Sequence, residues 1–489
     1  MDTPKQIHDD STTMDSKTQI TEGGAIAIDR AKEKKLVHKL DLHIIPVVML
    51  LYLLSFLDRV NIGNARLYGL EADLNLSSGQ YQIAVSILFV TYILSELPSN
   101  LILKGYVRPS RWIAFITVSW GIIATLTGIV QSYAGLIVCR LLLGLVEGGL
   151  FPGCAIYLTF FYTKHELALR IGYLFVSAAL AGACGGLLAY GIGFMDGVAG
   201  QSGWRWILIL EGLPTIVLGI ACWWILADEP ETAYYLNEEE KEMILARRAA
   251  QTGQTDVFDW KDVRKGLKDW KVWSFSVGQF CQDTMLYGYS TFLPTIILGI
   301  RPESSRAIVQ VLTIPCYALG AISYMAAARY SDWRQSRGPV VIVFCCIAVI
   351  GYALLISDSR SGVHFAGCFL VAMGLYVSVG IPLAWLPTNN PRYGSRTTAT
   401  GLQLTIGNAS GIMAPFLYPS GDGPRYLKGH AVTMALVALG AVLYGLLYLY
   451  FKRENRARAA GKRDAIIQGL NEEEIHALGA DNPKFVFAA

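Results

Sequence analysis

The feature that most constrains the fold of this chain is a series of twelve apolar runs, each close to the length that crosses a lipid bilayer. A transmembrane helix needs about 20 mostly apolar residues. The runs lie at residues 42–63, 81–103, 112–131, 134–160, 170–193, 206–227, 272–298, 307–328, 339–357, 363–386, 398–418 and 431–451. We therefore predict an all-α polytopic membrane protein whose twelve transmembrane helices form two six-helix halves, at 42–227 and 272–451.

The composition agrees with lipid as the main solvent. Only 16% of the 489 residues are charged, whereas a soluble domain carries about 25%. The formal net charge of +3 is small and the basic residues are not gathered in one block, so we expect no nucleic-acid partner. The nine cysteines lie inside the apolar runs without metal-type spacing. We expect them to pack as small apolar side chains, and we expect no metal and no cofactor.

The placement of lysine and arginine predicts the orientation in the membrane. Cytoplasmic loops are enriched in these residues. The short loops at 104–111 and 329–337 hold three each, against one or two in any loop on the other side. We therefore expect the N-terminal tail (1–41), the central linker (228–271) and the C-terminal tail (452–489) to be cytoplasmic. The first 41 residues are polar, so no cleavable signal peptide is expected.

Within the central linker, the stretch LNEEEKEMILARRAA predicts a short helix. Asn237 would be its N-cap and Glu240 the third residue after it, so that each side chain accepts a hydrogen bond from the other residue's backbone N–H. The motif LNEEE recurs at residues 470–474. The recurrence is either a relic of duplication or the same helix-start chemistry used twice, and we favour the second.

Ionisable residues inside the spans are few, and they mark candidate functional positions because charges are costly in lipid. The first apolar stretch, residues 42–57, would reach only about 24 Å as a helix. Its span must therefore take in Asp58 and Arg59. The other ionisable residues of this kind are Glu96, Arg140, Glu147, Glu211 and Asp283. For Glu96 and Glu211, each near a helix end, a structural role is at least as good an interpretation as a functional one.

Arg140 and Glu147 lie seven residues apart, two helical turns, and so share one face of the fourth span. Glycines beside them let a neighbouring helix approach, and Pro152 predicts a bend. The pair is either a buried ion-pair network that joins helices or part of a transport site, and we favour the site. An arginine can keep a carboxylate ionised while a second arginine binds an anion. A carboxylate whose partner leaves can then take a proton.

In the seventh span, Gln279, Asp283 and Tyr287 follow one another at intervals of one helical turn. Residues four apart lie on the same face of a helix, so the three form a polar stripe. We expect the stripe to line a substrate cavity, the alternative being a satisfied polar cluster in the core.

Two short basic loops, KGYVRPSRW and RYSDWRQSRG, occupy corresponding positions in the two halves. Such loops either reflect cytoplasmic topology alone or latch neighbouring helices when the cytoplasmic side closes. Asp332, placed among arginines, favours a latch in the second loop. The candidate gate residues are Lys104, Arg108, Arg111, Arg329, Asp332 and Arg337.

Several stretches spread over residues 40–450 share a resemblance to one family. They are FLDRVNIGNARL, ELPSNLILKGYVRPSRW, RLLLGLVEGGLFPGCAIYLTFFYTKHELALRIGYLF, AGACGGLLAYGI, GWRWILILEGLPT and WLPTNNPRYGSRTTATGLQLTIGNASGIMAPFLYP. Together they resemble the major facilitator superfamily, in particular the fungal allantoate and nicotinate permease group of its anion:cation symporter branch. The resemblance implies a proton-coupled symporter of a small organic anion, such as a nicotinate- or allantoate-like carboxylate, that works by alternating access.

The resemblance also implies roles for individual residues. Arg59 would bind the substrate carboxylate, and Arg140 would pair with Asp58 and also touch the anion. Asp58 and Glu147 would carry the proton.

Two regions depart from the pattern of the family. Leu103 stands where the first loop motif usually has aspartate, which weakens the latch expected there. The stretch WLPTNN differs around Leu386 and Pro387, and Asn389 and Asn390 within it are the candidate cavity residues.

Other functions stay open on the sequence alone. An exporter of a fungal metabolite or a drug/proton antiporter would use the same fold, although the two Asp/Glu–Arg sets favour uptake. A nutrient sensor would be expected to have a longer tail than the 38 residues after Phe451. An enzyme is the least favoured class, because the sequence has no nucleophile–base or metal constellation.

We expect the protein to be a monomer in the plasma membrane, with the vacuolar membrane as the alternative. Its partners would be the lipid bilayer, protons and the organic anion. Asn75, in the sequon NLS of the first outer loop, is a candidate glycosylation site.

Overall fold

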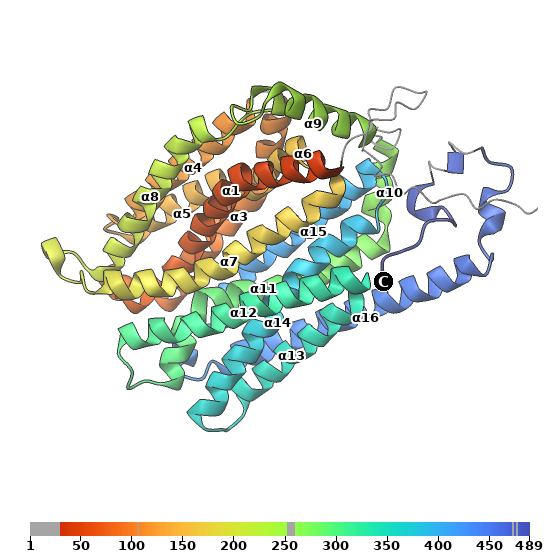
Figure 1. Ribbon diagram of the computed structural model, residues 1–489. Coiled ribbons are helices and arrows are strands. Elements are labelled where there is room, and N and C mark those ends of the chain that lie inside the picture. Colours follow the sequence, from red (N-terminus) through yellow and green to blue (C-terminus); the bar gives the residue numbers. More distant parts are fainter. Residues whose placement is uncertain (1–29, 106, 252–259, 472–473, 476–477) are drawn as a thin grey trace, which may run out of the picture.

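Helices form every predicted span in the computed structural model of the protein, which describes residues 30–105, 107–251, 260–471, 474–475 and 478–489. The spanning helices of the first half are α1 (Arg30–Leu67), α3 (Ser78–Gly105), α4 (Pro109–Thr127), α5 (Tyr133–Glu147) with α6 (Leu150–Phe161), α7 (Lys164–Gly193) and α8 (Gly203–Ile225). Those of the second half are α11 (Trp270–Ile300), α12 (Arg306–Arg334), α13 (Gly338–Ile356), α14 (Ser361–Thr388), α15 (Tyr393–Met413) and α16 (Leu427–Ala459). The predicted fold class is therefore confirmed: twelve transmembrane helices in two six-helix halves (Figure 1).

Shorter helices connect these elements. The α-helices among them are α2 (Leu70–Asp73), α9 (Glu238–Gln251) and α10 (Trp260–Lys268). The 3₁₀ helices are η1 (Val198–Gly200), η2 (Pro230–Thr232), η4 (Ala414–Leu417), η5 (Ser420–Asp422), η6 (Asp464–Ile467) and η7 (Gly479–Asp481). The described residues contain no β-strand.

The spans differ in how apolar they are. Among the described residues, nine helices are long and apolar enough to cross a bilayer by composition alone. The other three spans, α3, α11 and α15, carry polar residues such as Glu96, Asp283 and Asn408. These three helices lie where the halves meet, because α15 packs on α3 and α11 packs on α1. The more polar spans thus face the interior of the bundle, where polar groups can find partners away from lipid.

The fourth span is interrupted close to Pro152, but the break falls earlier than predicted. α5 ends at Glu147 and α6 begins at Leu150. A proline ring clashes with the carbonyl group four residues before it, which here belongs to Gly148. That glycine also permits close packing, since a Cβ atom there would collide with the backbone of Tyr92 on α3.

Hydrogen bonds join the two halves at the end of the bundle that lies away from the linker. We call the end that carries α9, α10 and the C-terminal segment the terminal end, and the opposite one the distal end (Figure 1). Near the distal end, Gln310 of α12 donates to Asn64 of α1 at 3.1 Å. Arg66 of α1 donates to the hydroxyl of Ser420 in η5. These hydrogen bonds hold the halves together on the distal side.

At the terminal end, the two linker helices attach to different halves. Lys39 of α1 donates to Glu240 of α9 at 2.7 Å. Arg392, the N-cap residue directly before α15, donates to Asp262 of α10 at 2.8 Å. None of the ion pairs that the structure describes joins one half to the other. Each half therefore carries its own part of the linker.

The predicted helix start in the linker is confirmed. The backbone N–H of Asn237 donates to Glu240 at 2.9 Å, and the N–H of Glu240 donates to the Asn237 side chain at 2.8 Å. Burial opposes ionisation of Glu240, but hydrogen bonds from Lys39 and Asn237 outweigh it and lower the pKa of Glu240. Asn471 and Glu474 form the same reciprocal bonds, so these two residues of the second LNEEE copy repeat the arrangement of Asn237 and Glu240.

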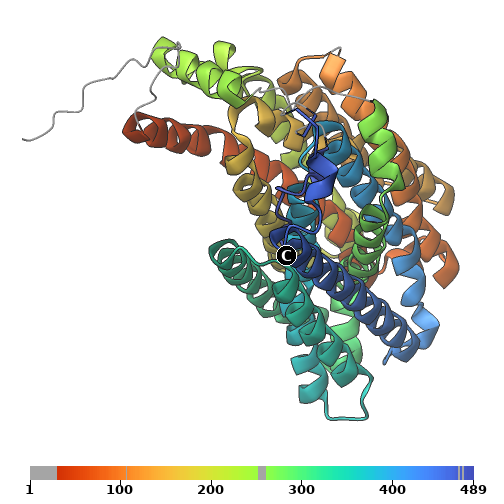
Figure 2. The same cartoon turned by 90° about the vertical axis from the view of Figure 1, so that its right-hand side faces the viewer.

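The C-terminal segment, residues 479–489, folds back onto the terminal end of the second half (Figure 2). α16 continues to Ala459, past the predicted end at residue 451, and so presents Arg458 to this segment. Arg458 donates to the backbone oxygens of residues 480, 482 and 485. Its guanidinium carbon lies 4.4 Å from the ring centre of Phe487, which stacks on Phe451 of α16.

We expect the variant Arg458→Ala to release the C-terminal segment. The substitution removes three hydrogen bonds from a charged donor, each worth about 1.5–3 kcal/mol, together with the contact to Phe487. Hydrogen–deuterium exchange over residues 479–489 should then be at least about tenfold faster than in the wild type. Arg453→Ala, at an exposed position of the same helix, is the control and should leave exchange unchanged. Equal exchange in all three proteins would contradict this role of Arg458.

Candidate functional site

The candidate site begins with two adjacent residues of α1, Asp58 and Arg59. Consecutive residues of an α-helix point about 100° apart. Asp58 faces α4, where the indole N–H of Trp120 donates to its carboxylate at 3.3 Å. Arg59 instead faces α5 and α3. Its Nε donates to Glu147 at 2.8 Å, and its guanidinium carbon lies 4.7 Å from the ring centre of Tyr92.

The ion pair between Arg59 and Glu147 is buried. The Glu147 side chain has an exposure of 0%, and that of Arg59 is 10%. Ser55, one turn before Arg59, donates its hydroxyl to the same carboxylate oxygen at 2.6 Å. The other oxygen of Glu147 has no hydrogen-bond partner among the described residues. One carboxylate oxygen of Glu147 thus accepts hydrogen bonds from both Ser55 and Arg59, and the other oxygen accepts none from the described residues.

The expected pair between Arg140 and Asp58 is not formed in this structure. Ser55 and Arg59 share the face of α1 that meets Glu147, whereas Asp58 points towards α4 and is bonded to Trp120. Arg140 is buried, with an exposure of 2%. Its Nε has no hydrogen-bond partner, and it forms no ion pair within the described part of the chain. Asp58 still lies within the electrostatic reach of Arg140.

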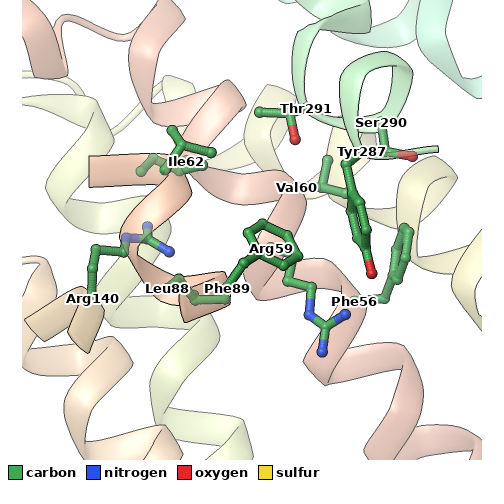
Figure 3. A pocket seen from close by; sticks show the side chains of 11 residues that line it. Phe56, Arg59, Val60, Ile62, Leu88, Phe89, Arg140, Tyr287, Ser290 and Thr291 are labelled. Carbon is green, nitrogen blue, oxygen red and sulfur yellow. The ribbon is translucent and has the colours of Figure 1, made fainter. Parts of the chain in front are cut away.

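Arg59 and Arg140 line one small cavity where the two halves meet (Figure 3). Its remaining walls are Phe56, Val60, Ile62, Val85, Leu88 and Phe89 from the first half and Tyr287, Ser290 and Thr291 from α11. Two guanidinium groups and three hydroxyl-bearing residues are therefore set into apolar walls. Such a setting suits a small anion with an apolar body.

The predicted polar stripe on α11 is present, but its members have different partners. Gln279 donates to Asp283 at 2.8 Å, and Gln403 of α15 donates to Gln279 at 3.1 Å. Tyr287 donates to Asn408 of α15 at 2.7 Å. Of the three stripe residues, Tyr287 alone lines the cavity with the arginines. Gln279 and Asp283 join α11 to α15 in this conformation.

Several residues of the site were not singled out by the sequence. Ser55 carries a detectable signal, because it lies four residues before Arg59 and so shares its face. Asn408 is a polar residue inside a span, which is a weaker signal. Trp120 and Tyr92 have no local signal, because aromatic residues are ordinary in apolar spans and their role depends on how α4 and α3 pack against α1.

Asn389 and Asn390 do not line the cavity that holds Arg59 and Arg140. α14 ends at Thr388, so both lie past its last turn, at the terminal end, where amide side chains commonly satisfy backbone groups. Asn389 exchanges two hydrogen bonds with the backbone of Ala488, at 2.8 and 3.0 Å. Asn390 donates to the backbone oxygen of Leu386 at 2.9 Å.

The candidate gate residues of the first loop lie at the terminal end. Arg108 is 3.8 Å from Asp228 and is largely exposed. The Arg111 guanidinium carbon lies 5.5 Å from the ring centre of Trp223 on α8. Both partners belong to the same side of the molecule as the loop. The side chain of Lys104 lies outside the described part of the structure.

The second loop does not form the expected latch around Asp332 in this conformation. Asp332 and Arg329 are exposed, and Asp332 forms no ion pair with a described residue. Arg337 turns instead to the end of α14, where it donates to Thr388 at 2.7 Å and to the backbone oxygen of Ala384. Arg337, one of the candidate gate residues, thus fixes the loop to its own half in this conformation.

Asn75 lies two residues after the end of α2, next to the distal end, with an exposed side chain and a positive φ of 49°. Its accessibility is compatible with a sugar acceptor, and its glycosylation stays a prediction.

Comparison with curated proteins finds transporters of similar length. An uncharacterised transporter of Schizosaccharomyces pombe is 40% identical over 452 residues, covering 91% of this chain and 89% of that protein. The high-affinity nicotinic acid transporter of Saccharomyces cerevisiae is 34% identical over 464 residues, covering 93% of this chain and 85% of that protein.

Solved structures share the fold at low sequence identity. An inward-facing, unoccupied bacterial homologue of the human lysosomal transporter Spinster matches with a TM-score of 0.66 at 16% identity, covering 84% of this chain and 97% of that one. A D-xylose–proton symporter matches with a TM-score of 0.64 at 14% identity, covering 82% and 97%. The family model of the Major Facilitator Superfamily matches residues 48–415. The chain, with its two six-helix halves and a cavity between them, belongs to the Major Facilitator Superfamily of membrane transporters.

Proposed function

We propose that this protein is a proton-coupled symporter of a small organic carboxylate. The observation that carries the proposal is Arg140, which is buried, lines the cavity and forms no ion pair among the described residues. A buried charge without a partner is costly, and an anionic substrate would supply that partner. The relative that transports nicotinic acid, 34% identical to this chain, supports a carboxylate as the substrate.

Arg59 would provide the second contact to the substrate. Its guanidinium group has five N–H donors in a planar fork, which suits the two oxygens of a carboxylate. One of those donors is bonded to Glu147 in the present structure. The rings of Tyr92 and Phe89 lie close by and would pack against the apolar body of the anion.

Proton coupling follows from the charges around the cavity. When ionised, Asp58 and Glu147 cancel the charges of Arg59 and Arg140. An incoming monocarboxylate would leave this buried group with one uncompensated negative charge. Protonation of either carboxylate restores neutrality, and in a low-dielectric site that neutrality is worth several kcal/mol. The anion and a proton therefore bind together.

Alternating access would use the division of the molecule into two halves. The halves are joined near the distal end by hydrogen bonds such as Gln310 to Asn64, while α9 and α10 are fixed to separate halves. The site lies between them, so a rocking motion would expose it to each side in turn. We propose that the protein is a monomer in the plasma membrane. Both termini would lie in the cytoplasm, because the terminal-end loops carry the excess of lysine and arginine.

The function is tested by uptake of labelled nicotinate, allantoate, ureidosuccinate and a short dicarboxylate into cells that lack their own carriers. At least one anion should enter faster at about pH 5 than at about pH 7, beyond the rate of vector controls, because coupled protons are more abundant at the lower pH. If no anion in the panel shows this behaviour, the symport proposal fails. Faster loss of a preloaded anion from expressing cells would point instead to an exporter.

The variant Arg59→Ala should reduce uptake of the transported anion by roughly tenfold to a hundredfold. A hydrogen bond to a charged group is worth about 1.5–3 kcal/mol, and each 1.4 kcal/mol is a factor of ten. Arg59→Lys keeps the charge but loses the fork, so its uptake should fall between those of Ala and the wild type. Arg360→Ala, at an exposed position, is the control. Wild-type uptake by an Arg59→Ala protein that reaches the cell surface would remove Arg59 from the site.

The variant Glu147→Gln should make uptake nearly independent of pH. Glutamine has the shape of protonated glutamate but cannot release the proton, so the cavity would accept an anion without further proton uptake. The ratio of the uptake rates measured at about pH 5 and about pH 7 should fall towards one. A ratio equal to that of the wild type would exclude Glu147 from the coupling.

A further inference from the structure

The proposed function does not use Glu211, an ionisable residue of α8 in the interior of the first half. Its exposure is 7%. Both of its carboxyl oxygens are buried and have no hydrogen-bond partner among the described residues. Its own backbone oxygen accepts the hydroxyl of Thr215, but this bond does not reach the side chain. Glu211 is therefore a carboxyl group in an apolar setting with neither a cation nor a donor.

Glu211 and Asp58 approach the same point of α4 from two other helices. Asp58 of α1 accepts the hydrogen bond from Trp120 of α4. The next residue along α4, Gly121, packs directly against the backbone of Gly212, the residue that follows Glu211. The contact between these two glycines joins α8 to α4 next to Trp120, the residue that binds Asp58 of α1, and α8 also packs against α1 itself.

The charged surroundings of Glu211 are simple. α8 packs against α1, α4 and α7, and among the described residues of these helices Asp58 is the charged group that acts on Glu211. Asp58 in turn is acted on by Arg140, Glu147 and Arg59. Asp58 therefore interacts electrostatically both with the two arginines, Arg140 and Arg59, and with Glu211.

Two neighbouring carboxyl groups in an apolar site cannot both be ionised without a large free-energy cost. Trp120 donates to Asp58 and Arg140 lies within electrostatic reach of it, so the ionised form belongs on Asp58. Glu211 has no such support and is the group that holds a proton. The two therefore form a carboxylic acid–carboxylate pair.

We propose that Glu211 is a second proton-carrying residue, which exchanges its proton with Asp58. This inference rests on the proposed symport function. When an anion binds Arg140, that arginine supports Asp58 less, and the O–H proton of Glu211 passes to a carboxylate oxygen of Asp58. Glu211 is then ionised in an apolar setting and takes a proton from water on the open side. The pair holds one proton without the anion and two with it, so that one proton accompanies one anion.

The variant Glu211→Gln separates this role from a structural one when two modes of transport are compared. Proton-driven accumulation of labelled nicotinate, or of the panel anion that the wild type carries best, should fall by at least about tenfold. Exchange of labelled for unlabelled anion across the membrane needs no net proton movement and should stay within about twofold of the wild type. Glu211→Asp, which keeps the ionisable group, should recover part of the accumulation.

Thr215→Val, one turn further along α8 and also buried, is the matched control for packing and should change both modes equally or not at all. An equal loss of both modes in Glu211→Gln would mean that Glu211 only supports the fold. Unchanged accumulation would overturn the inference while leaving the symport function in place. If the wild type accumulates no anion of the panel, the symport function itself fails, and the inference fails with it.

A measurement without substrate gives an independent result. Infrared spectra of the purified wild type should show the deuterium-sensitive carbonyl stretch of a buried, protonated carboxylic acid near neutral pH. The intensity of this band should be lower in Glu211→Gln than in the wild type and unchanged in Thr215→Val. A band of wild-type intensity in Glu211→Gln would show that other groups hold the proton, and would overturn the assignment to Glu211.

Discussion

The structure depends on one physical constraint: a charge that is removed from water must be matched by an opposite charge or neutralised by a proton. Arg59 of α1 and Glu147 of α5 meet this constraint for each other, because they form a buried ion pair at 2.8 Å. Ser55 adds a second donor from the same face of α1. Gly144 lets α5 lie so close to α3 that a Cβ atom would collide with the backbone of that helix. The ion pair and the close packing occur together in the first half, and beside them Arg140 has no ion-pair partner among the described residues.

The contribution of the second half is of a different kind. It brings hydroxyl groups and an aromatic ring to the cavity, and the carboxylate of its polar stripe, Asp283, is bonded within its own half to Gln279. Tyr287 is the stripe residue that reaches the cavity, and Asn408 of α15 fixes its hydroxyl. The two halves therefore contribute different groups to the cavity. The first half supplies the charged side chains, and the second half supplies hydroxyl groups and an aromatic ring. None of the described ion pairs ties the halves together, so their separation would break none of these pairs.

The twelve spans and their grouping could be predicted because hydropathy over about 20 residues is a local property. The ionisable positions were equally visible, since charges stand out in apolar runs. The partner of each charge was not visible, because it depends on the rotation of one helix against another: a difference of about 100° decides whether Asp58 or Arg59 meets Glu147. Asn389 shows a second limit. It resembles a cavity residue by type and position, but it binds the backbone of Ala488, about a hundred residues further along the chain.

The proposed coupling needs no dedicated proton channel, because it follows from the number of charges in a confined space. With Glu211 neutral, the ionised groups Asp58, Glu147, Arg59 and Arg140 sum to zero. An anion that entered alone would leave one uncompensated charge, at a cost of several kcal/mol in an apolar site. Since each 1.4 kcal/mol is a factor of ten, binding without a proton is disfavoured by about a hundredfold or more. The proposed proton transfer also fits the absence of a cation beside Glu211 among the described residues: a counter-ion there would stabilise the ionised form of Glu211 and oppose its protonation.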